Sequence, residues 1–167
     1  MKNLLLISGT GRNCGKTTLA CSIIEAFKSQ SVTAIKICPH FHPVDGMKSV
    51  FIDPGVIEIH EELQSNTGKD SSRMLNAGAE KVFYVQVKDN QLNKAWDIIL
   101  NKLPSEKPVI CESGRLSHIV EDHLHLLMIG KDKKKQASEL AHFSLAFEDI
   151  PALVDRLRFD TGKWFIS

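Results

Sequence analysis

Residues 3–18 read NLLLISGTGRNCGKTT, and this stretch decides how the rest of the chain is interpreted. Asn3–Ser8 is a short, continuous apolar run, which is typical of a strand buried on both faces. Gly15–Ser29 places apolar residues at helical spacing and therefore predicts a helix. A glycine-rich loop between a strand and a helix can hold phosphate through its backbone N–H groups and the helix N-terminus.

The loop at residues 9–18 carries the side chains that bind a nucleoside triphosphate. Lys16 is predicted to reach the β- and γ-phosphates, and the Thr17 hydroxyl to ligate magnesium. We therefore expect Mg²⁺ with GTP or ATP as the ligands. The pattern G-x-x-x-x-G-K-[ST] is incomplete, because Thr10 stands at its first glycine; the alternative is a turn that only caps a helix. The predicted nucleotide-binding residues are Gly11, Asn13, Cys14, Gly15, Lys16, Thr17 and Thr18.

Beyond this loop, β-type and helical segments alternate along the chain. Such alternation predicts an α/β fold, here a three-layer α/β/α P-loop NTPase with a mainly parallel sheet, in a single domain over residues 1–167. Further strands are expected at 32–37, 81–87, 108–111, 125–129 and 143–147, and further helices at 69–77, 91–103, 135–142 and 150–157.

An inserted β-hairpin is predicted at residues 47–61, where the alternation is interrupted. Two β-type runs, 48–52 and 56–60, flank the turn sequence Asp53-Pro54-Gly55. The alternative is an irregular surface loop. Because an isolated hairpin is marginally stable and its edge invites strand addition, we expect a homodimer formed through it.

Two acidic residues are candidate magnesium ligands beside Thr17. Glu112 follows the predicted strand 108–111, and ligands of open parallel sheets bind at the carboxyl ends of strands. The alternative is a surface-loop glutamate. We expect its carboxylate to be exposed, so that Glu112→Gln leaves stability nearly unchanged. Asp70 lies at the start of the helix 69–77. It is expected to act as the N-cap of that helix, as a metal ligand, or as both.

Lys36 is, with Lys16, a candidate catalytic residue. It lies in an apolar strand end, where a buried ammonium group needs an anionic partner such as a phosphate or a carboxylate. His40 and His42 follow and are expected to be solvated loop residues, with metal binding as the alternative. The basic run 131–135 is expected to be a solvated face, with a phosphate or base contact as the alternative.

Composition limits the partners. The net charge of +1 provides no general attraction to nucleic acid or to an anionic membrane surface. No apolar run approaches the ~20 residues of a membrane span. The four cysteines form no Cys-x-x-Cys pair, which favours reduced thiols in a cytoplasmic protein.

Together these motifs resemble the molybdopterin-guanine dinucleotide biosynthesis protein B (MobB) family. The resemblance is carried by Gly15-Lys16-Thr17-Thr18, by Ile35-Lys36 with His40 and His42, by the stretch from Gly68-Lys69-Asp70-Ser71 to Ala77-Gly78-Ala79, and by 109–114. It implies GTP binding, weak hydrolysis and an accessory role beside the guanylyltransferase that attaches GMP to molybdopterin. It also implies a homodimer, with Lys16, Thr17 and Glu112 at the nucleotide and metal.

The sequence departs from that family at three places. Glu112-Ser113-Gly114 replaces Glu-Gly, the histidine cluster is thinner, and the stretch 43–67 is longer. The spacing of the loop, Lys36 and Glu112 is also similar to that of dethiobiotin synthetase, an ATP-dependent ligase, although this chain is short for that family. An ATP-dependent ligase and a nucleotide-binding module without catalysis therefore stay open as alternatives.

Overall fold

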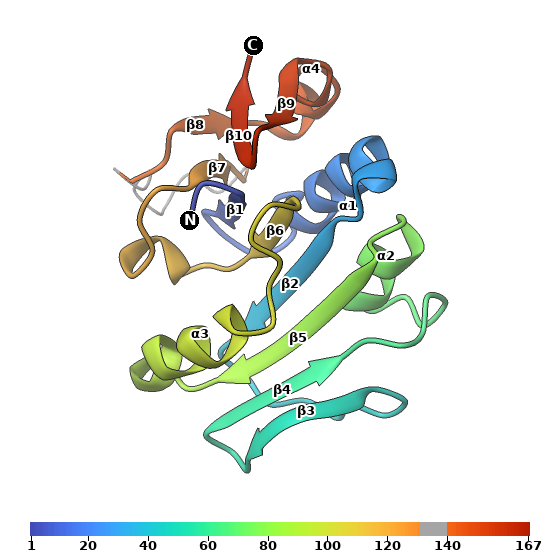
Figure 1. Ribbon diagram of the computed structural model, residues 1–167, viewed down its shortest axis with the longest axis vertical. Coiled ribbons are helices and arrows are strands. Elements are labelled where there is room, and N and C mark those ends of the chain that lie inside the picture. Colours follow the sequence, from blue (N-terminus) through green and yellow to red (C-terminus); the bar gives the residue numbers. More distant parts are fainter. Residues whose placement is uncertain (131–139) are drawn as a thin grey trace.

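The computed structural model describes residues 1–130 and 140–167. These residues form an α/β structure around an eight-stranded mixed sheet with the strand order β3-β4-β5-β2-β6-β1-β7-β8 (Figure 1). Six neighbouring strands are parallel, as the alternating sequence predicts. They are β1 (Leu4–Gly9), β2 (Thr33–Cys38), β5 (Lys81–Val87), β6 (Val109–Glu112), β7 (Leu124–Met128) and β8 (Phe143–Leu145).

The predicted hairpin is confirmed, and it belongs to the same sheet. It consists of β3 (Lys48–Asp53) and β4 (Ile57–Glu61), which pair in antiparallel fashion. β4 also pairs with β5, so the hairpin is not isolated. The premise that it needs a second chain for stability is therefore wrong. Of the two hairpin strands, β3 is the one at the edge of the sheet. That edge strand is irregular between Ser49 and Phe51, a feature that discourages strand addition.

Helices cover both faces of the sheet, in an arrangement compatible with a three-layer α/β/α fold (Figure 1). α1 (Lys16–Phe27), α2 (Asp70–Asn76) and α4 (Ile150–Arg156) pack on one face. α3 (Leu92–Leu100) packs on the other. Alternation along β1 supplies both cores: Leu5 and Ile7 face α1, whereas Leu4 and Leu6 face α3. The shorter 3₁₀ helices are η1 (Lys28–Gln30), η2 (Asp89–Gln91), η3 (Leu116–His118) and η4 (Phe147–Asp149).

The C-terminal part differs most from the sequence-based expectation. Of the helix predicted at 135–142, residues 135–139 lie outside the described residues, as does the basic run 131–135, and residues 140–142 are not helical. The strand expected at 143–147 ends at Leu145. A second hairpin, β9 (Leu157–Asp160) and β10 (Lys163–Ile166), was not predicted. Its Trp164 ring packs edge-on against Phe27, so the chain end covers the outer turn of α1.

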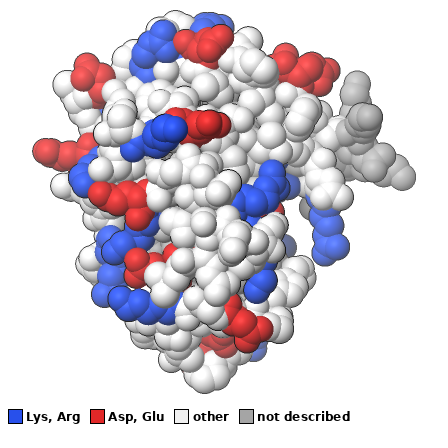
Figure 2. Space-filling model, turned by 90° about the vertical axis from the view of Figure 1, so that its right-hand side faces the viewer, with Lys and Arg blue, Asp and Glu red and all other residues white. Residues whose placement is uncertain are grey.

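The charged side chains on the surface are of mixed sign, as expected from the near-zero net charge. Figure 2 shows Lys and Arg side chains next to Asp and Glu side chains over much of the face it draws. Within the residues that the structure describes, no helix is long and apolar enough to cross a membrane. The four cysteines are free thiols, as predicted.

Candidate functional site

The loop at residues 9–18 connects β1 to α1 at the carboxyl edge of the parallel strands. Thr10 anchors it to the neighbouring strand β7: the Thr10 amide donates to the Met128 carbonyl at 3.0 Å. The Thr10 hydroxyl accepts from the Gly130 amide at 2.9 Å. The residue that departs from the G-x-x-x-x-G-K-[ST] pattern is therefore buried and holds the loop in place.

Two glycines of this loop, Gly9 and Gly15, lie where a side chain would not fit. Gly15 has a φ of +95°, and a Cβ there would lie 2.8 Å from the Phe147 ring. At Gly9 a Cβ would collide with the Cys14 sulfur. Cys14 is thus buried inside the loop. Asn13 also has a positive φ, of 55°, a conformation that asparagine tolerates better than most residues.

Lys16 curls over the loop. Its ammonium group donates to the Gly11 carbonyl at 2.6 Å and lies 3.4 Å from the Cys14 sulfur. A Cβ at Gly11 would meet no atom within 4 Å, so the loop is open to the cleft at this point. An ammonium group held above open backbone is suited to an anion that enters the loop.

Beside the loop, four predicted site residues from four different segments converge. Lys36 of β2 and Glu112 of β6 are direct partners in the parallel register, on the face covered by α1 and α2. The Lys36 ammonium lies 2.5 Å from Glu112 Oε1 and 2.9 Å from Asp70 Oδ2. The Thr17 hydroxyl donates to Glu112 Oε2 at 2.8 Å. We refer to Thr17, Lys36, Asp70 and Glu112 as the carboxylate cluster.

The charges in this cluster stabilise one another. Burial alone lowers the pKa of Lys36, but Glu112 and Asp70 outweigh it, and the net result is a raised pKa. Burial alone raises the pKa of Asp70, but the Lys36 ammonium and Thr17 outweigh it, and the pKa is lowered. Lys36 is thus a cation and Asp70 an anion at neutral pH.

Two expectations about the acidic residues need correction. Glu112 is not an exposed glutamate: it is 2% exposed, because β1 and β2 flank its strand and α1 covers it. Its loss will therefore affect folding. Asp70 is not the N-cap of α2, since Lys69 occupies that position and α2 begins at Asp70. The Asp70 carboxylate instead pairs with Lys36, which leaves the ion pair as its observed role.

The loop and the carboxylate cluster line one cleft of about 670 Å³. Every residue predicted from the sequence to bind nucleotide or metal, and both candidate catalytic lysines, lie on its wall. Pocket volumes of ~300–1,000 Å³ are usual for small-molecule sites. His40 lines this cleft too, whereas His42 does not.

Sequence reasoning missed several wall residues, of which Phe147 is the most informative. It was assigned to the end of a strand, but it begins η4 just after β8 and is 58% exposed. Its ring borders Gly15. The available signal was its position: Phe147 is an aromatic residue just after a strand, at the carboxyl edge of the sheet. Arg12, Pro39, Ser113 and Gly114 also line the cleft.

The donor atoms at the cluster suit a hard cation such as Mg²⁺. Thr17 contributes a hydroxyl oxygen, and Glu112 and Asp70 contribute carboxylate oxygens that already share the Lys36 ammonium. Magnesium proteins supply one or two carboxylates and take the remaining oxygens from phosphates and water. In the described part of the chain, no three His, Cys, Asp or Glu side chains gather as a metal site.

The chain matches no protein-family model, no curated protein and no solved structure.

Proposed function

We propose that this protein binds a nucleoside triphosphate with Mg²⁺ through the loop at residues 9–18, a P-loop. The observation that carries the proposal is the hydrogen bond between Thr17 and the buried Glu112, directly beside the loop that holds Lys16. A hydroxyl next to the loop lysine and a carboxylate at the end of a neighbouring parallel strand are the protein groups that position magnesium on bound phosphates.

Each group has a distinct part in this proposal. Backbone N–H groups of residues 11–18 and the Lys16 ammonium hold the β- and γ-phosphates. Thr17, with Glu112 directly or through water, would hold the magnesium, which would offset the charge of the phosphates. Lys36 adds a second ammonium at the γ-phosphate side, where its carboxylate partners keep it charged. Asp70 completes the acidic pair beside the ion.

Phe147 suits the base of the nucleotide. It borders Gly15 at the start of α1, on the β7–β8 side of the loop, opposite Lys36 and the cluster. Its ring is exposed and lines the same cleft. Every nucleobase has a π-face, so stacking on an aromatic ring gives affinity without selecting GTP over ATP.

We propose further that the protein acts in molybdenum cofactor biosynthesis as a MobB-like accessory factor with weak NTP hydrolysis. The support is the resemblance carried by Lys16, Thr17, Lys36, Asp70 and Glu112, which the fold gathers at one cleft. A molybdopterin guanylyltransferase is then the partner protein, in the cytoplasm. An ATP-dependent ligase is the second candidate, because another cleft opens beside the first.

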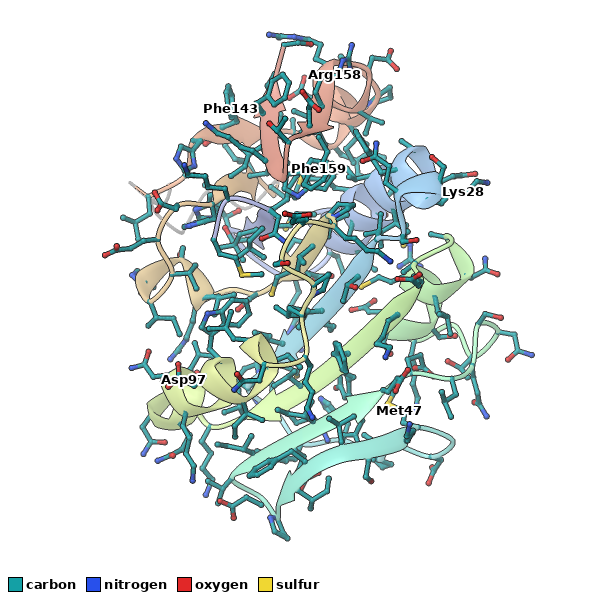
Figure 3. All side chains as sticks on the ribbon, viewed as in Figure 1. Lys28, Met47, Asp97, Phe143, Arg158 and Phe159 are labelled. Atoms are coloured by element: carbon teal, nitrogen blue, oxygen red, sulfur yellow. The ribbon has the colours of Figure 1, made fainter. Side chains whose placement is uncertain are left out.

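Lys16→Ala tests the nucleotide proposal. A charged phosphate contact contributes ~2–4 kcal/mol, so we expect the affinity for Mg·GTP and Mg·ATP to fall by roughly 30- to 1000-fold. Calorimetric titration measures it, with circular dichroism to verify folding. Lys28→Ala is the matched control, because Lys28 lies on the surface just past the other end of α1 (Figure 3). Equal affinities in Lys16→Ala and the wild type would refute the proposal.

A further inference from the structure

A second cleft of about 680 Å³ opens beside the nucleotide cleft. The two clefts share Arg12, Lys36, Cys38, His40 and Asp70. Lys36 is the link between them, since its ammonium group also belongs to the carboxylate cluster. A molecule in the second cleft would therefore lie next to the γ-phosphate end of the nucleotide.

The sheet and one loop shape this second cleft. Lys36 of β2 and Tyr84 of β5 are neighbours in the parallel register and lie on its wall. The loop 39–47 forms another wall and is fastened at two points: the His42 amide donates to the Gln86 side chain, and the Lys69 ammonium donates to the Pro43 carbonyl at 3.3 Å. The cleft is thus formed without any ligand.

Cationic groups dominate the charge of this cleft. Arg12, Lys36 and Lys69 line it, together with His40 and His42. Among the described residues that line the cleft, Asp70 is the one carboxylate, and it is paired with Lys36 and lies near Arg73. Arg12 and Lys69 are exposed, so their charges can meet an incoming anion, and the exposed imidazoles of His40 and His42 can donate hydrogen bonds to it. Convergent cationic groups of this kind favour a carboxylate or phosphate ligand.

The remaining wall is apolar enough to hold the body of such a ligand. Pro43, Met47 and the Tyr84 ring contribute to it. Burial and the neighbouring Cys38 thiol raise the pKa of Tyr84, so its hydroxyl stays neutral. Figure 3 shows Met47 beside β3 and β4, at the edge of the molecule that also carries α2. Small-molecule sites commonly combine an apolar lining with a few convergent polar groups.

We propose that the second cleft binds a small anionic molecule with an apolar or aromatic body, as the second ligand of the nucleotide-loaded protein. The inference rests on the proposed nucleotide function, because it places this ligand against the γ-phosphate through Lys36. Its anionic group meets Lys69 and the two histidines, and its body contacts Met47 and Tyr84.

The four methionine methyl groups allow the two clefts to be monitored separately by ¹³C NMR. Met47 lines the second cleft. The Met128 methyl lies 3.1 Å from the Cβ position at Gly15 and monitors the nucleotide loop, whereas Met74 is fully buried in the core. The Met47 resonance is assigned with Met47→Leu. Mg·GMPPNP, a non-hydrolysable nucleotide, fills the first cleft before the second ligand is added.

Phenyl phosphate is the probe, with benzyl alcohol and inorganic phosphate as matched molecules that lack the anion or the ring. We expect phenyl phosphate to shift the Met47 methyl resonance in a saturable manner and to leave the Met74 resonance unchanged. Its affinity should be at least tenfold higher than that of either matched molecule. Lys69→Gln removes the charge but can still donate to the Pro43 carbonyl, and it should lower the affinity for phenyl phosphate about fivefold or more. Lys88→Gln, an exposed lysine after β5, should not change it.

The outcomes separate this inference from the nucleotide proposal. No shift of Met47, equal affinity for benzyl alcohol, or equal affinity in Lys69→Gln would overturn the second site. Absence of a Met128 shift on addition of Mg·GMPPNP alone would overturn the nucleotide proposal, whatever Met47 shows. A phenyl phosphate shift that appears at Met128 and not at Met47 would place the anion in the loop and overturn the second site.

Discussion

Replacing Glu112 by glutamine tests both the structural and the metal role of the carboxylate cluster. The glutamine keeps the size of the side chain and removes its charge. In the wild type one carboxylate oxygen accepts from Lys36 at 2.5 Å and the other from Thr17 at 2.8 Å. Lys36 cannot accept a hydrogen bond, so the glutamine oxygen must face Lys36 and its amide must face Thr17, whose hydroxyl can accept.

The expected loss of stability follows from these contacts. A hydrogen bond to a charged group contributes ~1.5–3 kcal/mol and a neutral one ~0.5–1.5 kcal/mol, so Glu112→Gln should cost about 1–2 kcal/mol of unfolding free energy. The cost stays below the ~3–5 kcal/mol of a fully orphaned buried charge, because Lys36 keeps Asp70 at 2.9 Å.

Urea unfolding measures this cost in the absence of ligand, and calorimetry measures nucleotide affinity with magnesium and with EDTA. We expect the magnesium-dependent part of the affinity to fall and the magnesium-free affinity to stay nearly unchanged. Glu80→Gln is the control, since Glu80 is an exposed carboxylate that also pairs with a lysine, Lys107. An unchanged urea midpoint for Glu112→Gln would refute the buried ion pair, and normal magnesium dependence would shift the metal role to Asp70.

Three further outcomes are expected. Phe147→Ala should lower the affinity for both GTP and ATP about 5- to 150-fold, because a stacked base contributes ~1–3 kcal/mol, whereas Phe147→Trp should retain binding. Equal calorimetric affinities in Phe147→Ala and the wild type would rule out base stacking. The raised pKa of Lys36 means that its ion pairs stabilise the fold below its usual pKa of 10.5 and that this contribution disappears as the pH rises above the folded value. The gap in melting temperature between wild type and Lys36→Met should therefore narrow above pH ~10.5, and a constant gap would contradict it. If β3 edges pair in a homodimer, Ile52→Lys on this strand should give monomers by light scattering, and a monomeric wild type would exclude the dimer.

The sequence alone was sufficient for the parallel sheet, the first hairpin and the segments that carry the loop and the carboxylate cluster, but not for Phe147. The continuous apolar run in residues 3–8 is typical of a strand covered on both faces, residues 81–87 are rich in β-type residues, and Asp53-Pro54-Gly55 is a turn signal that depends on local chemistry. The second hairpin, β9 and β10, was harder to predict, because each of its strands buries only one residue, Leu157 in β9 and Trp164 in β10, and alternation is weak. Its turn, Thr161-Gly162, has two positive φ angles and was the available signal.

What the sequence could not provide is which charges meet. It placed Thr17, Lys36, Asp70 and Glu112 near the same sheet edge, because the carboxyl ends of parallel strands share one side of a fold. Only the tertiary structure decided that β2 lies beside β6, so that Lys36 neutralises a buried Glu112 which had been expected to be exposed. Strand order is set by packing between segments far apart in the chain, and local patterns carry no information about it. The burial of a charge, and therefore its cost when it is removed, depends on that order.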